Sequence, residues 1–282
     1  MGQFFETIPP SLIKWILDQK VFWVATAPLS SSGHVNVSPK GGQYFGVPDN
    51  KTFWYMDLSG SGNETISHLH EPGNGRVTIM FNAFEGPPRI MRLWGKGKVL
   101  EKGTAEFESW IAAHSVETIP GTRSIIVVDI HQVGTSCGFS VPFYDFKEFR
   151  PTLNDLFRKR AEKYAAGNEN ESIDRYWAHK NAWSMDGLPG MRRGQVVAKE
   201  KNVAPIKKMV GPLAPKRYIN PYGGVQLEAV VIIAIICFIL GISFALWMPF
   251  LRDLVFKPGT RGQFSGMGAR LHSITKYVGP LR

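Results

Sequence analysis

The stretch from Thr52 to Phe81 constrains the fold of this chain most, because it combines strand, glycine loop, helix and strand signals in succession. Residues 52–57 are mostly β-branched or aromatic, which is typical of a strand. The sequence Ser-Gly-Ser-Gly at 59–62 ends that strand, and Asn63 is a suitable N-cap for a helix. After a Pro- and Gly-containing break, residues 76–81 again have strand composition. The stretch therefore predicts two strands joined through a loop and a short helix.

The glycine loop of this stretch has two possible interpretations. A glycine-rich loop that leads into a helix leaves several backbone N–H groups unpaired and pointing one way, which favours a bound anion such as phosphate. The alternative is an ordinary tight turn before a short helix, and short glycine loops are common. The loop alone leaves both interpretations open.

Strand and helix signals continue on both sides of this stretch. Apolar faces at helical spacing predict four further helices, and β-branched or alternating runs predict four further strands; the helices are expected at 8–20, 104–114, 152–164 and 173–183, and the strands at 22–26, 34–38, 89–99 and 124–130. Gly95 and Gly97 interrupt one strand, which suggests a bulge, a barrel corner or a close neighbour. Short strands joined by hairpin-like turns predict an α+β fold, mainly β, built on a closed antiparallel barrel.

Charge is distributed unevenly along the 282 residues. The net charge of +10 arises from residues 190–282, which hold 14 Lys/Arg against 3 Asp/Glu, whereas residues 1–189 are almost neutral. Nucleic-acid binding by the folded part is therefore not expected. The two cysteines, Cys137 and Cys237, offer no disulfide framework, and neither they nor the histidines have the spacing of a metal site.

The C-terminal third of the sequence changes character. Residues 191–224 are rich in Pro, Lys and Arg and are interpreted as a linker. Residues 229–248 carry no charge, and 20 helical residues at about 1.5 Å each match the roughly 30 Å hydrocarbon core of a bilayer. This predicts a transmembrane helix within 225–250, in contact with membrane lipid and followed by a basic tail, 251–282. The alternative is a buried core helix.

The N-terminus bears on the expected location. It lacks a basic region followed by an apolar core, so no secretory signal is expected. The prediction is a single-pass membrane protein with a cytosolic folded domain. Neither the identity of the membrane nor the orientation of the span follows from the sequence, because the Lys/Arg counts on its two sides are similar.

Several segments in a fixed order resemble the pyridoxamine 5′-phosphate oxidase-like family, the FMN-binding split barrels. The resemblance rests on residues 24–26, 34–42, 53–63, 75–81 and 89–96. Further segments resemble the subgroup of this family that carries a helical extension; these are Cys137–Pro142, Tyr176-Trp177, Asn181 and Ser184–Gly190. The resemblance extends over about residues 8–190.

The resemblance implies a six-stranded antiparallel split β-barrel with flanking helices over residues 1–145, and a helical extension over 146–190 that packs on the barrel. It also implies a homodimer with FMN in the groove between the subunits. Taken with the apolar span, the predicted fold is α+β with a C-terminal transmembrane helix.

The resemblance also implies cofactor-binding residues. Ser38 and Lys40 match the end of the family's second strand, where a basic residue faces the FMN phosphate. Tyr55 and Met56 match positions along the flavin edge, and Asn63 matches the junction of loop and helix near the phosphate. The structural alternative for a residue such as Lys40 is an ordinary surface charge on a strand.

Arg89 and Arg92 match a strand whose side chains reach the ribityl or phosphate groups. Because their positions have opposite parity, they are not both expected to face the cofactor. The sequence also departs from the true oxidase, since Val35 replaces an arginine and Ile90 replaces a polar flavin contact. No catalytic residue is identified.

Three functions follow as hypotheses. The first is a membrane-anchored, FMN-dependent oxidoreductase acting on an unknown substrate. The second is a non-catalytic FMN-binding protein tethered to a membrane, and the third is a dimeric interaction module without a cofactor. Fold alone does not decide among them.

Overall fold

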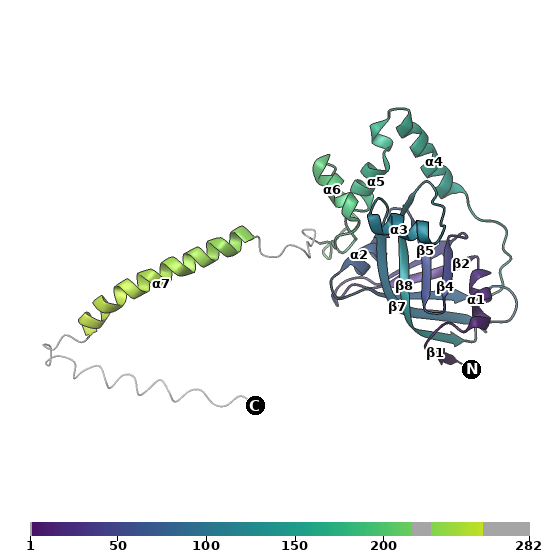
Figure 1. The fold of residues 1–282 in the computed structure, drawn as a ribbon, viewed down its shortest axis with the longest axis horizontal. Coiled ribbons are helices and arrows are strands. Elements are labelled where there is room, and N and C mark those ends of the chain that lie inside the picture. The colour runs from purple at the N-terminus through teal and green to yellow at the C-terminus, as the bar shows by residue number, and fades with distance from the viewer. Residues whose placement is uncertain (1, 216–226, 256–282) are drawn as a thin grey trace. The chain divides into compact units, whose positions relative to one another are not determined.

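The computed structural model describes residues 2–215 and 227–255, and the first of these ranges is organised around one antiparallel sheet (Figure 1). The strand order is β3-β2-β6-β7-β8-β5-β4, with β1 added beside β8. The strands are β1 (Gln3–Phe5), β2 (Val21–Thr26), β3 (Asn36–Gly41), β4 (Phe45–Asp49), β5 (Thr52–Leu58), β6 (Arg76–Asn82), β7 (Ile90–Glu101) and β8 (Thr122–Ser136). Buried and partly exposed residues alternate along β2 and most of β7, so the sheet has one core face and one outer face.

The sheet differs from the six-stranded barrel that was predicted. Within the described residues the sheet has eight strands, so the predicted number was wrong, although the α+β architecture of a curved antiparallel sheet with flanking helices is confirmed. The additional strands, β1 and β4, have weak sequence signals. Strand β1 has only three residues, and β4 contains Gly46 and Pro48, which are both depleted in strands. They form because β8 and β5 supply long neighbouring strands with which they pair.

Aromatic side chains fill the core between the two halves of the sheet. The Phe22 ring of β2 lies 5.1 to 5.5 Å, between centroids, from Phe45, Phe53 and Tyr55, which belong to β4 and β5. These strands lie toward the opposite end of the strand order from β2. Such ring pairs each add about 0.5–1.5 kcal/mol beyond their buried area, so this cluster stabilises the curvature of the sheet.

The two glycines of β7 permit close packing at a bulge. The pairing of β7 with β8 shifts register between Trp94 and Gly95. A Cβ atom on Gly95 would lie 2.4 Å from the carbonyl oxygen of Asp129, and one on Gly97 would lie 2.8 Å from the Leu69 side chain. The predicted bulge and close neighbours are thus confirmed.

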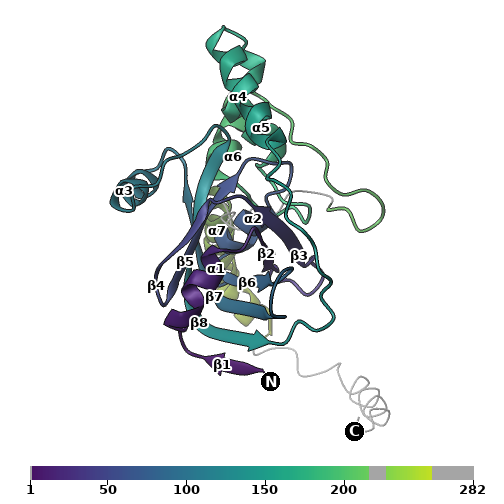
Figure 2. The ribbon, with the colours of Figure 1, turned by 90° about the vertical axis from the view of Figure 1, so that its right-hand side faces the viewer.

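Helices α3 to α6 gather at the end of the sheet where β7 ends and β8 begins (Figures 1 and 2). The helices of this part are α1 (Pro10–Leu17), α2 (Glu64–His70), α3 (Ala105–Ala113), α4 (Thr152–Ala165), α5 (Ile173–Lys180) and α6 (Arg192–Glu200), with a 3-10 turn, η1 (Glu169–Glu171), between α4 and α5. Helix α6 falls within the segment interpreted as a linker, so ordered structure extends beyond Gly190.

The second part of the chain contains helix α7 (Leu227–Val255). Crossing a bilayer requires about 20 consecutive apolar residues, or about 30 Å of helix. Among the residues that the structure describes, no helix combines that length with that apolar character. The predictions of a transmembrane helix and of a single-pass membrane protein were therefore wrong. The predicted basic tail, 251–282, lies mostly outside the described residues.

The helical extension packs closely against the glycine loop, with direct backbone contact. Gly190 packs directly on the Asn63 side chain and on the Asn181 backbone, where a Cβ atom would lie 1.7 Å from Asn63 Nδ2 and 2.3 Å from the Asn181 carbonyl oxygen. The Trp177 indole of α5 donates a hydrogen bond of 2.8 Å to the Ser59 hydroxyl. The loop and the extension therefore form one packed unit, and Gly190 is the residue with the least space.

Replacing Gly190 with alanine should destabilise the protein. A methyl group at this position must displace either a fully buried asparagine or a backbone carbonyl, and such overpacking costs about 1–3 kcal/mol. The matched control is Gly60→Ala in the same loop, where a Cβ atom would meet nothing within 4 Å. Urea unfolding of the two variants measures the difference. Equal midpoints would contradict the packing described for the extension.

Candidate functional site

A fully buried carboxylate, Asp57 on β5, lies at the centre of a group of charged side chains. Its Oδ1 atom is 3.0 Å from the Lys40 ammonium of β3, and its Oδ2 atom is 2.6 Å from Nε of Arg123 on β8. Strands β5 and β8 are hydrogen-bonded neighbours, whereas β3 lies at the far edge of the sheet. The Lys40–Asp57 pair therefore joins two strands that the backbone ladder does not connect.

The electrostatics of this group favour the ionised carboxylate. Burial raises the pKa of Asp57, but Arg123 and Lys40 outweigh that effect and hold the pKa at about 2. Two cations thus share one anion, and the group has a net charge of +1. Arg123 also donates from Nη1 to the carbonyl oxygen of Gly62 over 2.7 Å, which ties the charged group to the glycine loop. A site with excess positive charge beside exposed backbone can attract an anion.

Tyr55 lies beside this charged group and retains an unused polar atom. The Lys40 ammonium lies 5.7 Å from the centre of the Tyr55 ring. Burial, together with the negative charge of Asp57, raises the pKa of Tyr55 well above its usual value, so the phenol stays neutral. Its hydroxyl is buried and has no hydrogen-bond partner among the described residues. Such a group is costly to bury unpaired, which makes it a candidate to bond a bound molecule.

Met56 is on the other face of the same strand. Its sulfur accepts a hydrogen bond of 3.1 Å from the Thr122 hydroxyl, and its side chain packs in a second cluster with Leu100, Phe107 and Ile125. The two flavin-edge residues that the resemblance implies, Tyr55 and Met56, are therefore adjacent in sequence but lie on opposite faces of β5.

Strand β3 brings a row of polar side chains toward the glycine loop. Asn36, Ser38 and Lys40 alternate along one face of this edge strand. The Asn36 side-chain amide donates to the Thr65 hydroxyl at the start of α2 over 3.2 Å, and the Ser38 hydroxyl donates to Oδ1 of the same Asn36 side chain over 3.3 Å. Ser61 of the loop is exposed. The structure thus brings Ser38 and Lys40 together beside the loop.

Asn63 is directed away from this row. Its side chain does not cap α2; it donates to the Asn181 carbonyl oxygen over 2.8 Å and accepts from the ammonium of Lys208. Lys208 also lies 3.6 Å from the Glu64 carboxylate, and burial lowers the Lys208 pKa to about 8. Asn63 therefore contacts the helical extension and the segment after α6 rather than the polar side chains of β3.

Arg89 and Arg92 lie apart from each other and from Asp57. The Arg89 guanidinium stacks over the Trp15 ring of α1 at 5.4 Å. Arg92 is partly exposed and alternates with the buried Met91 and Leu93, which places it on the outer face of β7. In the described part of the chain, no hydrogen bond or ion pair joins either arginine to Lys40 or Asp57.

An aromatic cavity of about 920 Å³ opens beside Lys40. The neighbours of Lys40 on β3, Pro39 and Gly41, line it. Its aromatic lining residues come from α1, the loops between β3 and β4 and between β6 and β7, and the irregular segment after β8; they are Trp15, Tyr44, Phe84, Tyr144, Phe146 and Phe149. Cavities of this size with aromatic walls suit flat, conjugated ligands. Lys40, Asp57 and Arg123 do not line this cavity, because Pro39 and Gly41 lie on the face of β3 opposite to the Lys40 side chain.

Sequence reasoning missed several residues of this site, namely Asp57 and Arg123 as a pair, Trp177 as an anchor, and Lys208. A signal existed for Asp57, because a lone acid within an apolar strand is rarely buried without a partner. Arg123 opens the strongly apolar β8, which gave a similar signal. Lys208 had none, since it is one of many basic residues in a segment without periodicity.

The Asp57 ion pairs predict a specific dependence of stability on pH. Because the folded pKa of about 2 is below the ordinary value near 3.8, the pairs stabilise the fold above pH 4 and this contribution disappears between about pH 4 and pH 2. The shift corresponds to about 2 kcal/mol. Asp57→Asn should lose about 3–5 kcal/mol at pH 7, because Arg123 is left buried without its partner.

Unfolding in urea from pH 7 to pH 2 measures this contribution, which should be absent from Asp57→Asn. Asp18→Asn is the matched control, because Asp18 pairs with Lys14 on the surface and should cost under about 1 kcal/mol. If both variants lost the same small amount, the charged group would not stabilise the fold.

Comparison with known proteins adds the following. No family model matches the chain. The Pyridoxamine 5′-phosphate oxidase family protein ustO of Aspergillus flavus is 38% identical over 200 residues, which is 68% of this chain and 78% of that protein. Similar solved structures include HupZ of Group A Streptococcus, at 19% identity, and the FAD binding protein of Mycobacterium smegmatis, at 12%. The HupZ structure covers 45% of this chain and 92% of its own chain, with a TM-score of 0.34. The Mycobacterium structure covers 47% of this chain and 97% of its own, with a TM-score of 0.32. The identity with the Aspergillus protein over most of both sequences shows that this chain belongs to the pyridoxamine 5′-phosphate oxidase family.

Proposed function

We propose that the protein binds FMN next to Lys40 and acts as a flavin-dependent oxidoreductase. The observation that carries this proposal is the Lys40–Asp57–Arg123 group, which has an excess positive charge and includes a residue of the polar face of β3. Membership of the pyridoxamine 5′-phosphate oxidase family supports the same cofactor class.

The residues present fit a flavin phosphate. Lys40 supplies a compact positive charge, and its neighbour Ser38 supplies a hydroxyl on the same strand face. Asp57 fixes the Lys40 ammonium without cancelling the charge of the group, because Arg123 neutralises the same carboxylate. An ammonium that is already oriented loses little conformational freedom when an anion binds, which favours affinity.

The aromatic cavity fits the conjugated ring of such a cofactor, because its walls offer flat apolar surfaces. Tyr55 belongs to the core cluster and does not line this cavity. When FMN is bound, it supplies the redox chemistry, while the protein binds and orients the cofactor and excludes water. The substrate is left open, and a non-catalytic flavin-binding protein is the second candidate function.

We also propose that two copies associate through the outer face of the sheet. Phe4, Val35 and Val37 are exposed by 72%, 71% and 60%. Strand pairing places Trp23, Met80 and Arg92 side by side across β2, β6 and β7 on this outer face. An exposed apolar surface of this kind is typical of an interface. Arg92, rather than Arg89, would then face a groove between the copies.

Lys40→Ala should weaken FMN binding about 10- to 100-fold and leave riboflavin binding nearly unchanged. Charge-assisted hydrogen bonds contribute roughly 1.5–3 kcal/mol, and riboflavin has no phosphate with which to form one. Fluorescence titration of both ligands provides the measurement. Lys14→Ala is the control, because Lys14 is a cation exposed on α1 that pairs only with Asp18 among the described residues.

Equal losses for FMN and riboflavin in Lys40→Ala would mean that Lys40 acts through the fold rather than on the phosphate. An unchanged affinity for both ligands would contradict the proposed phosphate position, and Arg92 would be the next residue to substitute.

The double variant Val35→Asp/Val37→Asp should convert dimers to monomers, because charges introduced into an apolar interface must be desolvated when the copies associate. Light scattering reports the mass. Val210→Asp provides the control, since Val210 is equally exposed but lies far along the chain from the sheet. A wild-type protein that is already monomeric, or a double variant that remains dimeric, would exclude this interface.

A further inference from the structure

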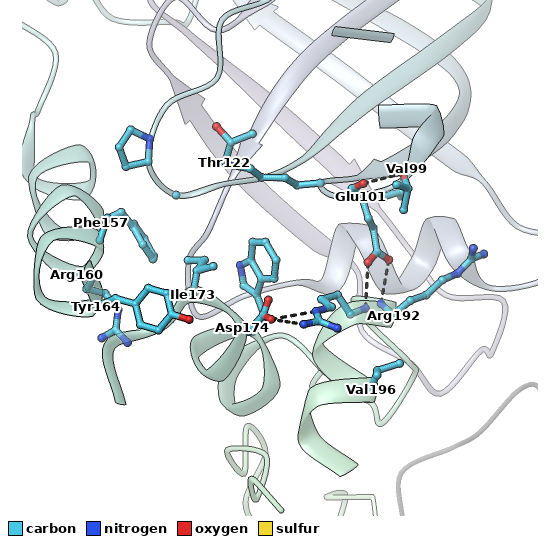
Figure 3. A pocket seen from close by; sticks show the side chains of 18 of the residues that line it. Val99, Glu101, Thr122, Phe157, Arg160, Tyr164, Ile173, Asp174, Arg192 and Val196 are labelled. Carbon is cyan, nitrogen blue, oxygen red and sulfur yellow. Dashed lines mark hydrogen bonds and ion pairs between the residues drawn. The ribbon is translucent and has the colours of Figure 1, made fainter. Parts of the chain in front are cut away.

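A second cavity, of about 750 Å³, lies between the end of the sheet and helices α4, α5 and α6 (Figure 3). Val99 of β7 and Thr122 of β8 contribute on the sheet side, and Phe157 and Ile173 on the helical side (Figure 3). None of the seven residues that the family resemblance implies for the flavin lines this cavity. The proposed flavin site therefore leaves it unexplained.

Two walls of the cavity are held by close packing. Gly121 has a φ of +94°, and a Cβ atom on it would lie 2.8 Å from the Phe157 ring, so this glycine permits the close approach of α4. The Phe157 ring also packs edge-on against Tyr176 of α5 at 5.2 Å. The Trp177 indole, which lines the cavity, is fixed by its hydrogen bond to Ser59.

The third wall, α6, is fixed by Glu101 at the end of β7. Met191 precedes α6 and offers no capping side chain, and the Glu101 carboxylate instead accepts from the backbone N–H groups of Arg192 and Arg193 over 2.9 and 3.3 Å (Figure 3). An acidic side chain at a helix N-terminus is also favoured by the helix dipole. The cavity is therefore formed before any ligand binds, which favours affinity.

All four acidic residues that line the cavity are already paired. Glu101 bonds the start of α6, Asp174 is bonded by the Arg193 guanidinium from Nε over 3.0 Å, and Glu171 lies 2.8 Å from Arg160. The remaining acid, Glu106, lies 3.3 Å from Lys98, a residue that does not itself line the cavity. No carboxylate in the lining is left to bind a cationic ligand.

Two basic residues of the lining have no such partner. Within the described ranges, the side chains of Lys102 and Arg192 form no ion pair, whereas the other lining cations, Arg160 and Arg193, each pair with an acid. Nε of Arg160 is buried and also lacks a hydrogen-bond partner there. The charge available to a ligand in this cavity is thus positive.

We propose that this cavity is a second ligand site, distinct from the flavin site, that binds a small organic acid with an aromatic or aliphatic body. The apolar and aromatic walls from Phe157, Trp177 and Val99 accommodate the body, and Lys102 and Arg192 attract the acidic group. The volume is within the usual range for small-molecule sites, which are mainly apolar with few polar groups that fix orientation. This proposal does not depend on the flavin.

Anilinonaphthalene sulfonate (ANS), an aromatic acid that fluoresces when it enters an apolar site, is a direct probe for the full-length protein. The double variant Lys102→Gln/Arg192→Gln should weaken ANS binding by at least about tenfold, because it removes both unpaired cations. Val196→Trp should block the cavity, since Val196 lines it and is partly exposed. Lys159→Gln/Lys199→Gln is the charge-matched control, because these exposed lysines belong to α4 and α6 but do not line the cavity.

The expected result is weaker ANS binding in the double variant and in Val196→Trp, with unchanged binding in the control and unchanged FMN affinity in all variants. Equal ANS binding in all variants would place the dye elsewhere, for example on the exposed Phe139 and Phe143, and would overturn the proposal. Absence of ANS binding to the wild type would do the same. A parallel loss of FMN and ANS would show that this cavity is the flavin site rather than a second one.

Discussion

The buried carboxylate of Asp57 is the constraint on which the rest of this structure depends. It ionises inside the protein only because Lys40 and Arg123 approach it from two other strands, and removing either partner would leave a costly buried charge. The same contacts close the curved sheet between β3 and β5, orient the Lys40 ammonium and hold the glycine loop through the Gly62 carbonyl oxygen. The stability of the fold and the preparation of the proposed anion site thus arise from a single interaction.

The glycine loop contacts the charged group on one side and the helical extension on the other. On one side, Arg123 of the charged group donates to the Gly62 carbonyl oxygen. On the other, Trp177 donates to the Ser59 hydroxyl, Asn181 to the Gly60 carbonyl oxygen and Lys208 to Asn63, and Trp177 also lines the second cavity. The two cavities share no lining residue, which is why we propose a separate ligand for each of them.

Local sequence patterns predicted much of the fold and part of the candidate site. The strand–loop–helix–strand stretch from Thr52 to Phe81 and the register shift at Gly95 follow from local sequence signals and are present. Strands β1 and β4 could not be predicted, because they depend on pairing with long neighbouring strands. The contacts of Arg123 and Lys208 with the loop required tertiary structure, since 61 and 145 residues separate them from their partners. The membrane span predicted from the uncharged run near the C-terminus was wrong, since no helix among the described residues is long and apolar enough to cross a bilayer.

The absorbance spectrum of the purified full-length protein, recorded after incubation with FMN and removal of free cofactor, tests the central claim most directly. The account predicts the absorption bands of oxidised flavin in the protein fraction, at about one FMN per chain, because each chain carries one Lys40–Asp57–Arg123 group and one adjoining aromatic cavity. A protein fraction that remains colourless and retains no FMN would contradict a flavin role for this site.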